Sequence, residues 1–270
     1  MSKLIRPLTL FLACLLLLGC ATSPTGRKQL MLVSEDSAIA SSRSAYLSTV
    51  KQLDDAGKLE DDWAVNKRVD VITGMLVTEA IKMRPETANW EWSVVVIDDP
   101  ETINAWCMAG GRMAIYTGLI TKLDPTDDEL AQVMAHEIAH ALANHTAEKM
   151  SMQIATSVGV AAVGVAADNS GVALSGAALT AMLAVNLPNS RAAETEADRI
   201  GIELAAKAGF DPAAAATLWQ KMGKASKSNP PQFLSTHPAP TNRQEELVQL
   251  EPEMRKYYDP HASHPIYKLN

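Results

Sequence analysis

The sequence has little of several features that would suggest a function at once. Its 270 residues include three cysteines, too few for a disulfide framework. Acidic residues outnumber basic ones, 31 to 24, and the isoelectric point near 5.4 argues against nucleic-acid binding through a basic surface. The chain has no internal repeat and no phosphate-binding loop. With 47% hydrophobic and 20% charged residues, the composition excludes a mainly disordered or fibrous protein.

The N-terminus carries an apolar segment that is too short to cross a membrane. Lys3 and Arg6 precede residues 8–18, whereas a spanning helix needs about 20 apolar residues. This pattern is typical of a secretory signal. The segment ends in Leu17-Leu18-Gly19-Cys20, which resembles the lipobox of bacterial lipoprotein signal peptides. The resemblance implies cleavage after residue 19, lipidation of Cys20, and a lipid anchor in a membrane that faces the periplasm.

The residue after the cysteine refines this expectation. Ala21, rather than aspartate, follows Cys20, which in such lipoproteins favours the outer membrane. An ordinary signal peptide with an accidental cysteine is the alternative. After cleavage, Cys107 would be the remaining candidate for a free thiol, and its simplest interpretation is a small buried apolar residue.

The rest of the chain predicts a mostly helical α+β domain over residues 34–257. A tether over 20–33 precedes it and a C-terminal tail over 258–270 follows. Apolar spacing predicts helices, and β-branched or turn-flanked runs predict a small sheet, in this order: helices at 34–53 and 62–83, strands at 93–97, 106–108 and 113–116, and helices near 212–223 and 241–256.

Residues 152–187 are rich in alanine, valine and glycine, with a break at 168–171. We expect two packed helices here, which could form a mobile lid. A transmembrane hairpin is the alternative, although each half is shorter than a usual span and poor in leucine, isoleucine and phenylalanine.

A second motif lies on a helix that begins near residue 127. Thr126 and Glu129 fit a capping box, and acidic residues in the first turn suit the helix dipole. Residues 136–140 then read His-Glu-Ile-Ala-His, an HExxH motif. Side chains four residues apart lie one above the other on a helix, so His136 and His140 can bind one metal ion. Glu137 would take a proton from water at that ion.

Catalytic zinc usually has a third protein ligand and an open position. The metzincin pattern would need histidine at position 146, where the chain has Thr146. His145 would point off the metal face, as a surface residue or one that supports a ligand, and Glu148 is too close along the helix. Downstream, Glu194 and Asp198 share one helical face, so one could bind metal while the other orients a ligand histidine. Glu196 lies well round from both, and a solvated acidic helix is the alternative for all three.

These residues resemble a known family. The HExxH motif with Glu194 and Asp198 is similar to the zinc metallopeptidases that include the CAAX prenyl proteases, HtpX, and the periplasmic BepA and LoiP proteases. Further similarity covers three segments before the motif and one after it, so that it spans about residues 90–245: Asn104-Ala105-Trp106, Gly110-Gly111-Arg112, Tyr116-Thr117-Gly118-Leu119, and Ser235-Thr236-His237-Pro238 with Arg243. The lipobox places the chain nearer the lipid-tethered periplasmic members, and the fold implied is gluzincin-like, with a sheet edge flanking the HExxH helix.

The resemblance implies a role for each matching residue. His136, His140 and Glu194 would bind one Zn²⁺, Glu137 would be the general base, and Asp198 would hold a ligand histidine. His237 and Arg243 would face the site. His237 would either occupy the open position of the metal and keep the enzyme latent, or stabilise the oxyanion. A substrate-binding edge strand would comprise five residues: Arg112, Met113, Ala114, Ile115 and Tyr116.

Two functions follow from these expectations. The first is a membrane-tethered zinc endopeptidase that cleaves misfolded or stalled cell-envelope proteins, because main-chain pairing at a sheet edge gives little side-chain selectivity. The second is a latent or non-catalytic lipoprotein that acts as a chaperone or assembly factor for outer-membrane proteins. The outer-membrane assembly machinery is a possible partner of either, and nucleic acid is not.

Overall fold

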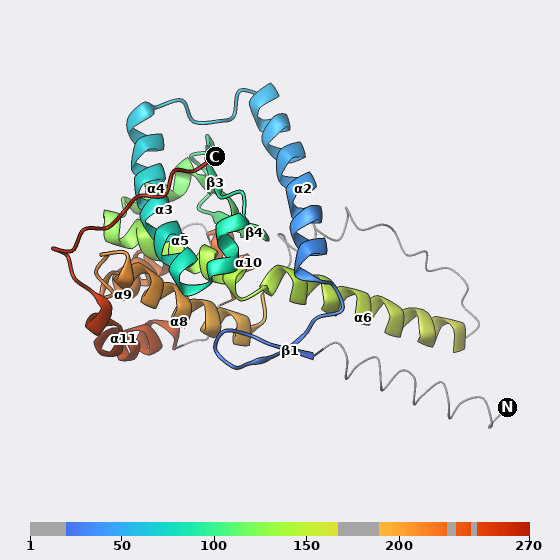
Figure 1. Cartoon of the computed structure of the whole chain (residues 1–270). Helices are drawn as coiled ribbons and strands as arrows, with labels where there is room; N and C mark the ends of the chain where they lie inside the picture. The colour runs from blue at the N-terminus through green and yellow to red at the C-terminus, as the bar shows by residue number, and fades with distance from the viewer. Residues whose placement is uncertain (1–19, 167–188, 226–230, 239–241) are drawn as a thin grey trace.

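The computed structural model describes residues 20–166, 189–225, 231–238 and 242–270 as a mostly helical domain with a two-stranded and a three-stranded sheet (Figure 1). This confirms the predicted α+β class. The strands are β1 (Cys20–Thr22), β2 (Lys28–Leu30), β3 (Ser93–Ile97), β4 (Ala105–Met108) and β5 (Arg112–Tyr116). The helices are α2 (Glu35–Asp55), α3 (Trp63–Met83), α4 (Thr117–Leu123), α5 (Asp127–Leu142), α6 (His145–Ala166), α8 (Arg191–Lys207), α9 (Ala214–Ala225), α10 (Gln232–Thr236) and α11 (Arg243–Met254), with 3₁₀ turns η1 (Pro85–Asn89) and η2 (Arg255–Tyr257).

The three-stranded sheet contradicts one sequence prediction. Its strand order is β3-β5-β4, with β5 parallel to β3 and antiparallel to β4. Residues 112–116 therefore form the central strand, and the prediction that they form a substrate-binding edge is wrong. Both sides of β5 are paired because the Gly110-Gly111 turn, with φ of 86° and 79°, folds it onto β4 while β3 adds on the other side. Among the described strands, β4 is the edge that packs against α5.

Helix α5 lies at the centre of the core, between the sheet and α8. Its predicted capping box is present: the Thr126 hydroxyl accepts a bond from the Glu129 backbone N–H, and the Glu129 carboxylate accepts one from the Thr126 N–H. Residues 129–142 are all buried. The HExxH motif is therefore embedded in a helix that is buried along most of its length, which fixes its backbone.

Close contact between α5 and α8 depends on one glycine. A Cβ atom on Gly201 would lie 3.0 Å from the backbone Cα and N atoms of His136. The two helices can approach this closely because residue 201 has no side chain. This approach lets the carboxylates of α8 reach the histidines of α5.

Gly201→Val should therefore damage both stability and the metal site. Overpacking of this kind costs about 1–3 kcal/mol, and the displaced α8 would carry Glu194 away from His136. Urea unfolding and zinc content by mass spectrometry of the purified chain measure the two effects. Gly223→Val, on α9, where no atom lies within 4 Å of an added Cβ, is the matched control. Equal zinc content in both variants would contradict the expectation.

Both terminal segments of the described chain pack on the domain. Residues 20–33, expected to form a tether, instead contain the β1–β2 hairpin, whose side chains bond to α6 and α8. The tail over 258–270 contacts α3, where Tyr267 N–H donates to Gly74 O, and the segment before β3, where Asn270 N–H donates to Trp92 O. Long-range contacts order both segments, and such contacts leave no periodic pattern in the sequence.

Two sequence predictions concern residues outside the described ranges. The signal peptide over 1–19 is one, and the second half of the 152–187 segment is the other. The first predicted helix of that segment is present as part of α6. Within the described residues, no helix has the length and apolar character needed to cross a bilayer.

Candidate metal centre and active site

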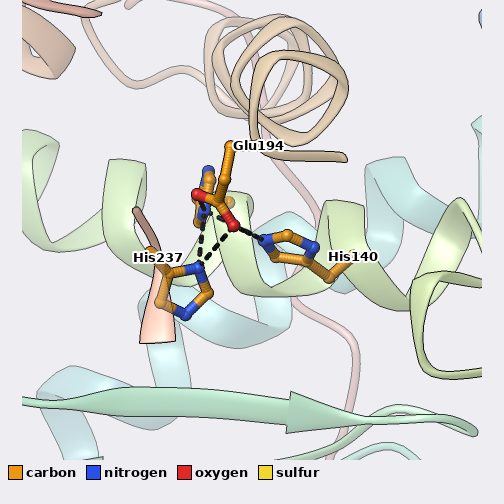
Figure 2. Close-up of side chains that lie close together, drawn as sticks. His140, Glu194 and His237 are labelled. Atoms are coloured by element: carbon orange, nitrogen blue, oxygen red, sulfur yellow. Dashed lines mark hydrogen bonds and ion pairs between the residues drawn. The ribbon is translucent and has the colours of Figure 1, made fainter. Parts of the chain in front are cut away.

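Three elements bring four candidate metal-binding side chains together. His136 and His140 project from successive turns of α5, Glu194 from the first turn of α8, and His237 from the C-cap of α10. Figure 2 shows His140, Glu194 and His237 pointing toward one another. All four are buried. The ligand atoms that they offer lie within 4.8 Å of one another. The three metal ligands predicted from the sequence thus converge, and His237 joins them.

The spacing of these atoms suits zinc. His136 Nε2 lies 3.0 Å from His140 Nε2, 3.3 Å from His237 Nδ1 and 3.3 Å from Glu194 Oε2. Glu194 Oε1 lies 3.4 Å from His140 Nε2 and 3.0 Å from His237 Nδ1. Ligands of tetrahedral zinc at bond lengths near 2.0–2.1 Å are about 3.4 Å apart. Nitrogen and carboxylate donors at this separation therefore fit one Zn²⁺ ion.

The pKa values of the ligands differ. Burial lowers the pKa of His136, but hydrogen bonds to Asp198 and Glu194 raise it to about 9, so a metal ion would displace a proton from this ring. Burial lowers the pKa of His140, so its imidazole is neutral, as a ligand must be. Burial would raise the pKa of Glu194, but His140, His136 and His237 around it hold that pKa far below its ordinary value. Glu194 is therefore a carboxylate, with its negative charge directed at the three imidazoles.

Glu137 lies beside the cluster with a free oxygen. Its Oε1 atom is buried and makes no hydrogen bond, although His237 Nε2 lies 3.3 Å away. Burial raises the pKa of the Glu137 carboxyl, partly opposed by His237 and His136. A carboxylate that is poised to take a proton and has an uncommitted oxygen is what a general base requires. This is the role predicted for Glu137.

Asp198 and Arg243 support the ligands. Asp198 Oδ1 lies 3.1 Å from His136 Nδ1, so an Nδ1–H would be donated to this carboxylate and Nε2 left free for metal. The Arg243 guanidinium donates to Glu194 Oε2 at 3.0 Å and to Asp198 Oδ1 at 2.5 Å. It also stacks over the Trp219 ring at 3.8 Å. Arg243 was expected to face the site, and it does so by holding the carboxylates of Glu194 and Asp198.

The sequence interpretation missed Asn189. Its side-chain NH₂ donates to Glu194 Oε1 at 2.8 Å, and its backbone N–H donates to Thr236 O at 3.0 Å. Asn189 thereby links the Glu194 carboxylate to the segment that carries His237. The residue lies just before the helix-capping Ser190, and its sequence position contains no signal for this contact, which depends on the docking of α10.

We expected His145 to lie on the same helix as the HExxH motif, but it begins the next helix. Asn144 adopts a left-handed backbone with φ of 56°, which ends α5 and starts α6 in a new direction. This turn buries the His145 ring, 2% exposed, with Nδ1 2.7 Å from Nδ1 of His140. Of the two options left open, a surface residue and one that supports a ligand, the structure selects the second.

A small cleft opens beside the metal cluster. Trp106 and Cys107 of β4 line it together with Glu137, Lys149 and Thr236. The edge strand thus borders the Glu137 carboxylate. Burial raises the pKa of the Cys107 thiol well above its ordinary value, in agreement with its interpretation as a small buried residue.

Together, an HExxH helix, a glutamate from a second helix and a bordering sheet edge define a zinc metallopeptidase. Sequence comparison identifies the family, because residues 65–251 match the model of Peptidase family M48. The chain belongs to this family. This confirms the predicted family at that level, while the lipoprotein subtype is a separate question.

Named relatives agree with the family. The chain is 37% identical to the mitochondrial metalloendopeptidase OMA1 of Schizosaccharomyces pombe over 70% of its own length and 52% of that protein. It is 32% identical to OMA1 of Bos taurus, over 86% and 46%. It is 30% identical to the beta-barrel assembly-enhancing protease of Escherichia coli, over 72% and 40%. The chain thus spans about half the length of these relatives, or less.

Proposed function

We propose that this protein is a membrane-tethered zinc metalloendopeptidase that hydrolyses peptide bonds of misfolded or stalled cell-envelope proteins. The observation that carries the peptidase assignment is the buried Glu137 Oε1, which has no hydrogen bond and lies beside the four clustered ligand atoms. Zinc bound there would supply a Lewis acid and lower the pKa of a bound water towards about 7.

The residues of this chain would carry out proton transfer, orient the metal ligands and bind the substrate. Glu137 takes a proton from the attacking water at its free oxygen and delivers it to the leaving amine. Asp198 and Arg243 keep His136 and Glu194 oriented during this transfer. An extended substrate pairs with the free edge of β4, which places its main chain beside Glu137. Main-chain pairing suits substrates that are unfolded rather than defined by one sequence.

The envelope location rests on the N-terminus and on one group of relatives. The positively charged start, the short apolar segment and Cys20 are typical of a lipoprotein signal. Several relatives are named as beta-barrel assembly-enhancing proteases of bacteria. We therefore place the protein in the bacterial envelope, lipid-anchored at Cys20 and facing the periplasm, with the outer membrane as its expected membrane.

To test this proposal, the full chain, purified in detergent with its zinc content measured, is incubated with unfolded outer-membrane protein and with the same protein folded in micelles. We expect cleavage of the unfolded form and little cleavage of the folded form. Mass spectrometry of the N-terminus and membrane fractionation test the anchor, with Cys20→Ser as the control that should release the protein. Intact unfolded substrate, or an unlipidated Cys20, would contradict the corresponding half of the proposal.

A second function is favoured by the position of His237. Its Nδ1 atom lies within 3.3 Å of both His136 Nε2 and Glu194 Oε1, where a fourth metal ligand would be. Such a ligand would close the open position that catalysis needs. The protein would then be latent, or would act without cleavage as a chaperone or assembly factor for outer-membrane proteins.

His237→Ala distinguishes these functions. If the bound histidine limits turnover, this variant should cleave unfolded substrate about tenfold faster than the parent with equal zinc, because the fourth position becomes free. If His237 stabilises the oxyanion, cleavage should fall about 10²-fold. Phe233→Leu, which changes a ring stacked on His237 without removing the imidazole, is the control. If neither the parent nor His237→Ala cleaves the substrate, although both bind zinc, the result would favour the non-catalytic function.

A further inference from the structure

The N-terminal hairpin is bonded to the protein directly behind the metal cluster. Arg27 donates to both oxygens of Glu148, at 2.7 and 2.6 Å, and through Nε to Glu196 Oε2 at 2.7 Å. The Thr25 hydroxyl donates to Glu196 Oε1 at 2.5 Å. Gln29 donates to the carbonyl of Ala143 at 2.8 Å, where α5 ends. Paired, charge-assisted bonds of this kind are among the stronger side-chain contacts in proteins.

Glu196 continues the chain of bonds towards the metal ligands. Its Oε2 atom lies 3.1 Å from His145 Nε2, and His145 Nδ1 lies 2.7 Å from His140 Nδ1. All three residues are buried, at 5% exposure or less. A continuous path of hydrogen-bonded groups therefore joins Thr25 and Arg27 of the hairpin to a metal-binding histidine.

The donors and acceptors along this path agree with metal binding by His140. When Nε2 of His140 faces the metal cluster, the proton of the neutral ring sits on Nδ1 and is donated to His145 Nδ1. His145 then carries its own proton on Nε2 and donates it to the Glu196 carboxylate. Each N–H along the path then has an acceptor, and each acceptor receives a hydrogen bond. Carboxylate and histidine partners of this type set the orientation of a ligand imidazole.

We propose that the β1–β2 hairpin is a working part of the metal centre: it fixes Glu196, which through His145 holds the His140 imidazole in its metal-binding orientation. His145 and Glu196 are positioning residues in this arrangement, and Arg27 and Thr25 position Glu196. Sequence distance hides the relation, because Arg27 is 113 residues away from His140 and reaches it through two intermediates. All of these residues lie within the described ranges, and the arrangement is independent of the proposed anchor and substrate.

The test measures how fast the metal leaves the full chain. The zinc-loaded protein in detergent is mixed with an excess of a coloured chelator, and the rate of zinc transfer is followed. His145→Leu should release zinc about 10- to 100-fold faster, as expected when a partner of a ligand histidine is lost. His145→Gln should restore a slow rate, because its amide can accept from His140 and donate to Glu196. Arg27→Gln should release zinc at least about threefold faster, as a more distant member of the path.

Arg199→Gln is the matched control for Arg27→Gln. It removes an exposed ion pair to Glu253, at 2.6 Å, from the same helix that carries Glu196. We expect it to release zinc at the rate of the parent.

A second readout separates positioning from general stability. Visible absorption of the Co²⁺-loaded chain reports the geometry of the ligands. It should change in His145→Leu and Arg27→Gln and stay unchanged in Arg199→Gln. Unfolding of the zinc-free variants is measured in parallel. The proposal would be overturned if Arg27→Gln released zinc as slowly as Arg199→Gln and had the same cobalt spectrum. This holds even if His145→Leu loses zinc or fails to fold.

Discussion

Glu137→Gln should lower the rate of peptide-bond hydrolysis by about 10²- to 10⁴-fold, the range expected when a general base is removed. The amide has nearly the shape of the carboxylate but cannot take a proton at neutral pH. Because the Glu137 carboxylate is not one of the four clustered ligands, zinc content should stay at the parent value. Cleavage of unfolded protein, followed by the appearance of new N-termini, measures the first effect, and elemental analysis the second.

The same chemical change elsewhere on α5 is the control. Glu129→Gln makes the same change at the start of the helix, where glutamine can replace glutamate in the capping box. Its bond from Lys221 is weakened, so we expect a modest loss of stability and near-parent cleavage. Equal cleavage by Glu137→Gln and the parent would remove Glu137 from the reaction and favour the non-catalytic function.

Arg243→Met should destabilise the zinc-free protein by about 3–5 kcal/mol, the usual cost of breaking a buried ion pair by removing one partner. Arg243 is 3% exposed and lies between the carboxylates of Glu194 and Asp198. Without the guanidinium, these two charges stay buried beside the imidazoles and the neutral Asn189 amide. Zinc would offset part of the charge on Glu194, so the loss in the zinc-loaded protein should be smaller. Urea unfolding with and without chelator measures both values.

Arg255→Met provides the comparison. Arg255 pairs with Glu251 and Asp211 but its side chain is 45% exposed. Exposed pairs contribute about 0–1 kcal/mol, so this variant should stay close to the parent. A loss in Arg243→Met no larger than that in Arg255→Met would mean that the carboxylates of α8 do not depend on the buried arginine.

The helices and the principal ligands could be predicted because they depend on local order. The apolar spacing of residues 62–83 describes α3 almost to the residue, and the Thr126 capping box marks the start of α5. Four-residue spacing places His136 and His140 on one face wherever the helix packs, and it does the same for Glu194 and Asp198. These patterns are properties of a single helix, and the tertiary structure preserves them.

Predictions that needed knowledge of neighbours were less successful. Residues 112–116 are strand-forming, but strand propensity does not reveal which sides of a strand are paired, and β5 is paired on both. Helical spacing left His145 as either a surface residue or one that supports a ligand, and only the left-handed turn at Asn144 decides for the second. The segment at 20–33 has the composition of a tether, and it is ordered by Arg27 and Thr25 reaching α6 and α8.

The sequence by itself determined the chemistry: two histidines, a base and a distant glutamate, each on a helix whose periodicity sets the direction of its side chain. The tertiary structure alone decided which groups support that chemistry. Contacts such as Asn189 with Glu194, and the path from Arg27 to His140, join residues far apart in the chain. Such contacts arise from the packing of α5 against α8 and of the hairpin behind them. Local periodicity carries no information about that packing.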